Sequence, residues 1–149
     1  AEDRAQKLVD GYKKRLDAFR EKSNQIQNKP KVYFEEWDDP TFSGIRWVSE
    51  LIEIAGGEDI FSNKSHGKLA MEREIQWSDI VEKNPDIILA SWCGKPVDID
   101  SIKEREGWDQ ISAIKNNRIH EIDSSIILQP GPASLTEGLK VLESLIREQ

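Results

Sequence analysis

The sequence predicts an α/β fold in which a mainly parallel sheet is flanked by helices and follows one long helix. Short apolar segments that suit β-strands alternate with amphipathic segments that suit helices, and this alternation is typical of parallel sheets covered on both faces. The segment DIILAS (86–91) is an unbroken apolar run, as expected of such a covered strand. A chain of 149 residues fits one domain, whose core needs no disulfide or metal.

The first element is a helix predicted over residues 2–27. Apolar side chains recur at helical spacing among charged ones, at Ala5, Leu8, Val9, Tyr12, Leu16, Phe19 and Ile26. Asn28 and Pro30 end the pattern. A helix of this length spans about 39 Å, which is roughly the diameter of the rest of the domain.

The middle of the chain holds two predicted strands and two helices. KVYFE (31–35) is rich in β-branched and aromatic residues and predicts a strand. Ser43 is the expected N-cap of a helix that runs to about Ala55, and Gly56 with Gly57 predicts a left-handed turn after it. Residues 61–73 are polar and suit a loop. Ser78 is the expected cap of a short helix over 79–83, which precedes the DIILAS strand.

The last third of the chain continues the alternation. A helix is expected over about 98–106, a short helix near Ala113, and a strand at RIHEI (118–122). Pro130 to Pro132 suits a rigid loop, after which Ser134 opens the final helix. Because Glu137 follows Ser134 by three residues, the pair predicts a capping box.

Composition excludes several classes of function. The net charge of −7, from 28 acids and 21 bases, disfavours nucleic acid and anionic membranes as partners. Cys93 is the only cysteine, and with two histidines a zinc cluster is not expected. No apolar run approaches the roughly 18 residues of a transmembrane helix, and no signal peptide is recognised.

Candidate binding residues follow the strands, because ligands of open α/β sheets bind beyond the carboxyl ends of the strands. The three ends carry Glu35 to Asp38, Ser91 to Gly94 and Asp123 to Pro130. Trp37 and Trp92 lie on the first two, which suits a flat, mostly apolar ligand with polar groups at its edge. The alternative is that both rings merely pack over the strand ends.

Catalytic interpretations are weaker. Glu35 with Glu36, or Asp38 with Asp39, could indicate glycoside hydrolysis or a calcium site, but adjacent strand residues point to opposite faces, and a solvated acidic loop is expected. A small α/β hydrolase-like enzyme needs a nucleophile–base pair, and the strand ends offer only Cys93, with His66 or His120 distant in sequence.

Four stretches then resemble one protein family. They are KVYFEEWDDPTFSGIRWVSELIEIAGGEDIF, SDIVEKNPDIILASW, GWDQISAIKNNRIHEID and ILQPGPASLTEGLKVL. They resemble the C-terminal half of substrate-binding proteins of ABC importers, in particular the cobalamin-binding group of a set that also serves ferric siderophores and haem. The resemblance implies two α/β lobes joined by a long helix, with the ligand between them. Residues 1–28 would be the interlobe helix and 29–149 the C-terminal lobe, with the N-terminal lobe absent from this chain.

The resemblance also implies roles for single residues. The ligand-binding positions are Trp37, Glu36, Trp92, Ser125, Ile126 and Gln129. Cobalamin binders often carry an acid and an arginine in the last of these loops, where this chain has Ser125 and Gln129. Cobalamin would be a transported ligand and not a cofactor, no catalytic or metal-binding residue is implied, and the location would be periplasmic or membrane-anchored extracellular.

Asp79 has two interpretations. An acid in the first turn of a helix complements the helix dipole whatever else it does. The resemblance implies instead that Asp79 meets arginines of the permease.

Haem and siderophore receptors of the same set are the alternatives. Haem calls for a His, Tyr or Met at the cleft, but Tyr33 and His120 fall within predicted strands. Siderophores often call for basic residues, and the strand ends offer only Lys95.

The absent lobe has a consequence for the first helix. Leu8, Tyr12, Leu16 and Phe19 should form an uncovered apolar stripe, and such stripes are association sites. A homodimer through the first helix is therefore expected, with or without exchange of the helices.

Overall fold

The computed structural model describes residues 2–148. In chain order the elements are α1 (Glu2–Asn24), β1 (Lys31–Trp37), β2 (Phe42–Ser43), α2 (Arg46–Ala55), β3 (Glu58–Asp59), the 3₁₀ turn η1 (Ala70–Arg73), α3 (Trp77–Lys83), β4 (Ile87–Ala90), α4 (Ile99–Lys103), the 3₁₀ turn η2 (Trp108–Gln110), α5 (Ser112–Lys115), β5 (Ile119–Glu121), α6 (Ser124–Ile127), the π turn η3 (Ser134–Gly138) and α7 (Leu139–Arg147).

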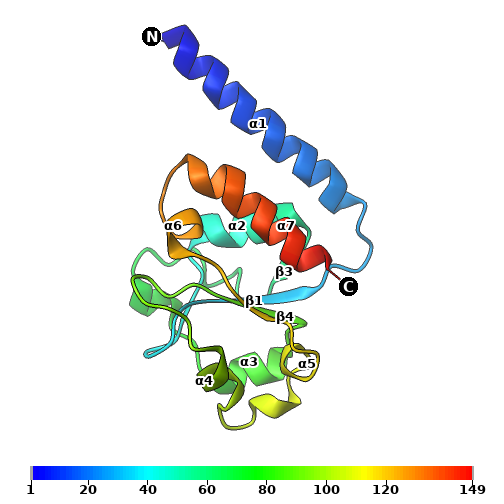
Figure 1. Cartoon of the computed structure of the whole chain (residues 1–149), viewed down its shortest axis with the longest axis vertical. Helices are drawn as coiled ribbons and strands as arrows, with labels where there is room; N and C mark the ends of the chain where they lie inside the picture. The colour runs from blue at the N-terminus through cyan, green and yellow to red at the C-terminus, as the bar shows by residue number, and fades with distance from the viewer. Residues whose placement is uncertain (1, 149) are drawn as a thin grey trace.

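The sheet has the order β2-β1-β4-β5, with β3 paired to the beginning of β1. The three strands predicted from the sequence are adjacent and parallel, with Phe34 opposite Leu89 and Leu89 opposite His120. Among the strands within residues 2–148, β2 alone pairs antiparallel, with β1. In Figure 1, α2, α6 and α7 cover one face of the sheet, and α3, α4 and α5 cover the other. The predicted α/β class is therefore confirmed.

The core has two layers, one on each side of the sheet. Val32 and Phe34 of β1 belong to the layer under α2 and α7, whereas Tyr33 belongs to the layer above α3 and α5. In β4, Leu89 and Ile88 divide in the same way, and both are fully buried. Because β4 faces apolar helices on both sides, its four side chains are all apolar and buried, without alternation.

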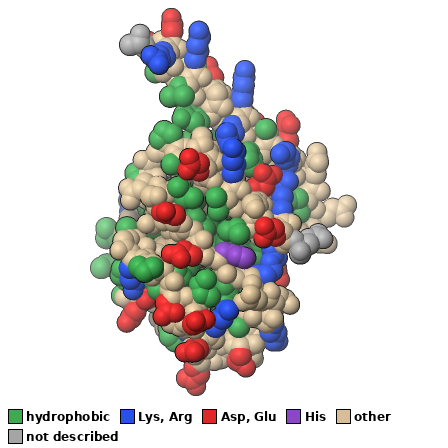
Figure 2. All heavy atoms as spheres, in the orientation of Figure 1, with side chains coloured by type: hydrophobic (Ala, Val, Ile, Leu, Met, Phe, Trp, Pro, Cys, Tyr) green, Lys and Arg blue, Asp and Glu red, His purple; other side chains and the backbone are tan. Residues whose placement is uncertain are grey.

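Helix α1 is held to the body by its C-terminal half only. Phe19 is 8% exposed and packs into the core, and the Ser23 hydroxyl donates to the Glu53 carbonyl of α2 over 2.9 Å. Leu8, by contrast, is 58% exposed. Figure 1 shows the N-terminal half projecting past the body, and hydrophobic side chains gather on it in Figure 2. The expected uncovered stripe is therefore exposed at Leu8, only partly exposed at Tyr12 and Leu16, and wrong at Phe19, which belongs to the core cluster with residues of α2 and α7.

The three predicted serine caps, at Ser43, Ser78 and Ser134, are wrong. Ser43 lies in β2, where its hydroxyl donates to the Arg73 carbonyl, and α2 begins three residues later at Arg46. Ser134 donates its hydroxyl to the Gly131 carbonyl, so it makes no capping box with Glu137. The Ser134 hydroxyl thus bonds a nearby carbonyl in place of a cap N–H. The Ser43 hydroxyl is taken by a carbonyl 30 positions away, through tertiary packing.

Other boundaries differ in smaller ways. Gly56 has a φ of 105° and closes α2 as predicted, with its N–H bonded to the Glu53 carbonyl. Helix α3 begins at Trp77, so Ser78 lies inside it and does not cap it. The third strand end, expected to be a loop, holds the short helix α6, whose N-cap Asp123 accepts the Ser125 N–H. Among residues 2–148, none of the helices has the length and apolar character that a membrane crossing requires.

Candidate functional site

The carboxyl ends of β1, β4 and β5 meet at one edge of the sheet, as expected from their parallel pairing. Glu35 pairs with Ala90, and Ala90 pairs with Glu121, so the chain leaves all three strands in the same direction. We call the ends of these strands and the residues beyond them the rim: 37–39 at the end of β1, 91–97 after β4 and 122–129 after β5. In open α/β sheets this edge holds the ligand.

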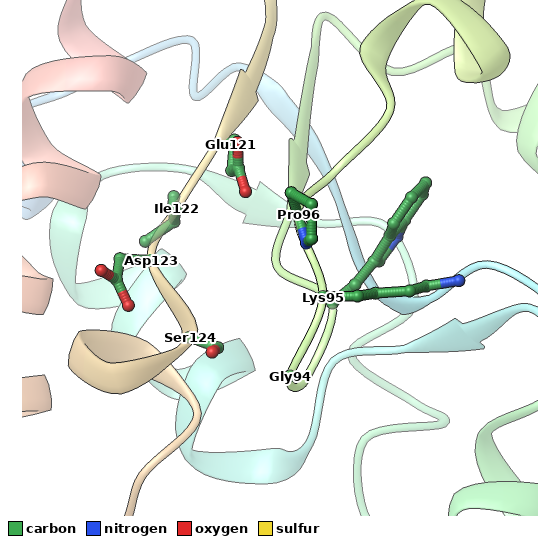
Figure 3. Close-up of a pocket in the computed structure, with 8 residues that line it drawn as sticks. Gly94, Lys95, Pro96, Glu121, Ile122, Asp123 and Ser124 are labelled. Atoms are coloured by element: carbon green, nitrogen blue, oxygen red, sulfur yellow. The ribbon is translucent and has the colours of Figure 1, made fainter.

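A hollow of about 610 Å³ opens at the rim between β4 and β5. It is lined by Trp92, Gly94, Lys95, Pro96, Glu121, Ile122, Asp123 and Ser124. Figure 3 shows Asp123 and Ser124 on one wall and Gly94 to Pro96 on the other, with the Lys95 side chain directed away from Asp123. The hollow is thus bounded by carboxylates on one side and by a turn of backbone on the other.

Lys95 connects the first two parts of the rim. Its ammonium nitrogen lies 2.8 Å from Oδ1 of Asp38, 4.4 Å from the ring centroid of Trp37 and 4.8 Å from that of Trp92. The Trp37 indole N–H donates to the Asp39 carbonyl over 3.0 Å, which fixes the ring at the strand end. The two predicted tryptophans are therefore brought together around one cation.

The contact with Lys95 affects the pKa of Asp38. Partial burial raises the pKa of its carboxyl, but the hydrogen bond from Lys95 and those from backbone N–H groups outweigh burial. The pKa of Asp38 is accordingly lowered from its ordinary value of 3.8, and the ion pair with Lys95 is present at neutral pH.

The carboxylate of Glu35 is hydrogen-bonded within a buried network and does not face solvent. Arg105 donates to both carboxylate oxygens, at 2.6 and 2.9 Å, and its side chain is only 5% exposed. The Tyr33 hydroxyl and the Trp92 indole N–H donate to the same carboxylate, at 2.7 and 3.0 Å. The expectation of a solvated acidic loop is therefore wrong for Glu35, because four hydrogen bonds, from Tyr33 on the same strand and from the distant Trp92 and Arg105, compensate its burial.

This network also positions Trp92. Its indole N–H is held inward by Glu35, while the residue as a whole is 4% exposed. Arg105 is itself packed between Trp77 and Trp108, at 4.9 and 4.5 Å from the two ring centroids. Burial, followed by the charge of Glu35, raises the pKa of Tyr33 well above its usual range, so its hydroxyl stays protonated and can donate.

Glu36, near the end of β1, is hydrogen-bonded to Ile45 and Arg73. Its carboxylate accepts the N–H of Ile45 at 3.0 Å and two donors of Arg73 at 2.7 and 3.1 Å. Arg73 is 3% exposed and also donates to the Ser43 carbonyl. Glu36 therefore links β2 and η1 to β1, and its carboxylate is bound by these donors and does not line the hollow.

The third part of the rim contains Ser125, Ile126 and Gln129. Ser125 and Gln129 are exposed on and after α6, while Ile126 is partly buried against the core under α2. The structure lines the hollow with their neighbours Asp123 and Ser124 instead. A short helix rotates successive side chains away from each other, and no pattern in the sequence indicated that α6 would form.

Glu121 was missed because it lies within the last predicted strand. It lines the hollow and accepts the Val97 N–H at 3.0 Å. With Asp123, which caps α6, it gives this wall two carboxylates. The pKa of Asp123 is lowered by its hydrogen bonds from Ser125, so this carboxylate is ionised at neutral pH. Such a lining repels anions and suits neutral or cationic groups.

Asp79 lies in the first turn of α3, on the face of the sheet opposite α2 and α7, and does not line the hollow. It is partly exposed, and within residues 2–148 its carboxylate forms no ion pair or hydrogen bond. Its placement is compatible with both interpretations, since it adds negative charge at a helix start and leaves the carboxylate accessible.

The residues considered for catalysis are not brought together. Cys93 is exposed on the loop after β4, His120 is partly buried within β5, and His66 is exposed in the turns before η1. No hydrogen bond joins the thiol to either imidazole in the described part of the chain. Nor do residues 2–148 contain a group of three or more side chains that could hold a metal ion.

Comparison with known proteins gives a consistent result. The family model described as periplasmic binding protein matches residues 1–126. An uncharacterized ABC transporter substrate-binding lipoprotein of Bacillus subtilis is 28% identical over 157 residues, which cover 98% of this chain and 45% of that protein. The vitamin B12-binding protein of Vibrio parahaemolyticus is 22% identical over 142 residues, or 94% of this chain and 49% of that protein.

A solved structure agrees with the fold. A possible iron-binding, periplasmic solute-binding protein of Staphylococcus epidermidis superimposes with a TM-score of 0.80 at 28% identity, over 99% of this chain and 56% of that one. The chain thus spans about half the length of the relatives it matches.

Proposed function

The chain belongs to the periplasmic binding protein family, and from this premise we propose that it is the C-terminal lobe of the substrate-binding component of an ABC importer. The ligand we propose is a corrinoid such as cobalamin, held at the rim against a second, N-terminal lobe. One observation carries the proposal: two tryptophans and a hollow of about 610 Å³ share the edge at which the parallel strands end.

The family is one of solute binding and not of catalysis, and its place is extracytoplasmic. Cobalamin would be carried through unchanged, so the rim needs shape, aromatic surface and matched polarity but no nucleophile. Tryptophan faces suit this task, because they offer large rigid contact area at low entropic cost.

Charge favours a corrinoid over the anionic alternatives. Glu121 and Asp123 line the hollow, and the ammonium of Lys95 is paired with Asp38. The carboxylates of haem or of a ferric siderophore would meet repulsion there, whereas the amide-bearing edge of a corrinoid would not. Haem also needs an axial ligand, and no His, Tyr or Met lines the hollow. Tyr33 is fully buried, with its hydroxyl committed to Glu35.

The domain division follows the same proposal. Residues 1–28 are assigned to the interlobe helix and 29–149 to the lobe, because α1 is anchored by Phe19 and Ser23 and otherwise projects. The N-terminal lobe would complete the cleft. Asp79 is proposed to dock an arginine of the permease, which its free carboxylate and partial exposure support.

A homodimer of the chain through α1 is proposed as well. Leu8 and Val9 are 58% and 44% exposed, so pairing two such helices removes apolar surface from water. Sedimentation of wild-type chain at high concentration should show dimer, and a Leu8→Glu variant should shift it toward monomer. Monomer alone for the wild type would overturn this part.

Ligand titration tests the main proposal. We expect cyanocobalamin to bind the chain weakly, because half the cleft is lacking, and to bind more tightly than haemin or a ferric siderophore. Trp37→Ala should weaken cyanocobalamin binding by about tenfold, as expected for loss of one stacked aromatic ring. Lys115→Ala, on α5 at the other end of β5, is the control and should bind as the wild type does. Preference for haemin, or equal affinity of Trp37→Ala and wild type, would contradict the assignment.

A further inference from the structure

The ammonium of Lys95 occupies the surface that a flat ligand would use. It lies over the faces of Trp37 and Trp92, at 4.4 and 4.8 Å from the ring centroids, and 2.8 Å from a carboxylate oxygen of Asp38. Two aromatic faces and a carboxylate around one cation are the elements with which proteins recognise ammonium ligands. Here the cation belongs to the protein itself.

The backbone aims Lys95 at this position. Gly94 has a φ of 81°, so the chain reverses after Trp92, and a Cβ at Gly94 would meet no atom within 4 Å. The position thus needs glycine for its conformation and not for space. The reversal directs the lysine side chain across the ends of β4 and β1, away from the Asp123 wall of the hollow.

The ion pair between Lys95 and Asp38 is partly exposed to water, which allows the lysine to leave it. The Lys95 side chain is 39% exposed and that of Asp38 is 25% exposed, so water screens the ion pair and competes for both partners. The Trp37 ring is held separately by its bond to the Asp39 carbonyl, and Trp92 is held by Glu35. The cage would therefore persist if the lysine left it.

We propose that Lys95 is an internal competitor: its ammonium fills a cage made by Trp37, Trp92 and Asp38 in the free lobe, and must leave when a ligand stacks on these rings. This inference rests on the proposed function for the identity of the ligand, but the cage itself does not. The chemical class that the emptied cage takes is a cationic or neutral flat group, since Asp38 would then be unpaired. Lys95 accordingly sets specificity through the cost of its displacement.

Tetramethylammonium tests the cage without any corrinoid. It is titrated as the chloride into the wild-type chain and into Lys95→Met and Lys95→Arg variants, with sodium chloride at equal ionic strength as reference. The readout is the indole N–H resonance of Trp37. Lys95→Met, which keeps the length of the side chain and removes its charge, should bind tetramethylammonium about threefold or more tightly than the wild type. Lys95→Arg keeps the internal cation and should match the wild type.

Equal affinities of Lys95→Met and the wild type, or no binding to either, would overturn the proposal. Trp37→Leu added to Lys95→Met removes the Trp37 resonance, so this double variant is followed through the indole N–H of Trp92, whose ring also faces residue 95. It should bind tetramethylammonium no more tightly than the wild type, which assigns the gain to the Trp37 ring. Cyanocobalamin gives a separate arm: Lys95→Met should bind it more tightly, and weaker binding would make Lys95 a direct ligand contact and refute competition. If neither form binds cyanocobalamin, the corrinoid assignment fails while the tetramethylammonium result still decides on the cage.

Discussion

Glu35 shows how a single buried carboxylate shapes the rim. It joins Tyr33 of its own strand, Trp92 of the next loop and Arg105 of the segment after α4. Buried pairs of this kind contribute little over an apolar replacement, but a lone buried charge is costly. The residue therefore constrains geometry more than it adds stability, and the ring of Trp92 depends on it.

Glu35→Gln should destabilise the chain by about 3–5 kcal/mol, because the Arg105 guanidinium would remain buried without its counter-charge. Urea unfolding followed by circular dichroism measures the change. Glu50→Gln is the matched control, since Glu50 pairs with Arg46 on the exposed face of α2, where the two side chains are 58% and 63% exposed. That variant should change the free energy of unfolding by no more than about 0.5 kcal/mol. Equal effects of the two variants would refute the network.

The lowered pKa of Asp38 leads to a prediction about low pH. Its pKa is lowered below 3.8, so the charged form is favoured by folding, and the contribution of the Lys95 pair is present above that value and lost as pH falls through the lowered pKa. Trp37 fluorescence should stay constant from pH 7 to about pH 4 and change only below it. Asp38→Asn should show no such step. A step near neutral pH in the wild type would contradict the assignment.

At the scale of single residues, the sequence predicted which residues lie at the strand ends but not which side chains they contact. Trp37 and Trp92 could be placed at strand ends because a strand, its end and its direction follow from local pattern. The pairing of Glu35 with Arg105 could not be predicted, since Arg105 is 70 positions away and nothing in the nearby sequence indicates that Arg105 is buried. Long-range polar pairs of this kind are formed by tertiary packing, which no periodicity reveals.

Helix α1 divides into an anchored and a projecting half. Phe19 packs into the core between α2 and α7, and residues 2–10 are exposed. Phe19→Ala should therefore cost about 3 kcal/mol in the free energy of unfolding and release α1 to proteolysis. Leu8→Ala should cost less than about 0.5 kcal/mol in the same assay. If Leu8→Ala proved as costly as Phe19→Ala, α1 would be covered along its whole length.

The sequence allowed the helices α1 to α5 and α7 and the strands β1, β4 and β5 to be located, because local pattern and the residues that flank each element indicate it. The elements that escaped are short: β2, β3 and α6 have two to four residues each. Such elements are stabilised by their neighbours and not by propensity. Two of them border the site, since β2 is tied to Glu36 through Arg73 and α6 carries Ser124 beside the hollow.

As a whole, the molecule presents one edge at which three loops meet and one helix that leaves the body. The parallel order β1-β4-β5 gathers these loops at the edge, and α1 is anchored to the body through Phe19. The alternation of strands and helices was enough to predict this arrangement. The polarity of the hollow was not predictable, because Glu121 faces it from inside a strand.

The central claim is that the joined strand ends are the ligand-binding surface. The five tryptophans allow a direct measurement, since each has one indole N–H resonance. Trp37 and Trp92 lie at the rim around Lys95, whereas Trp77 and Trp108 pack against each other elsewhere. With saturating cyanocobalamin, the resonance of Trp37 should shift, while that of fully buried Trp108 should stay in place. An unchanged Trp37 resonance, with shifts confined to tryptophans away from the rim, would contradict the account.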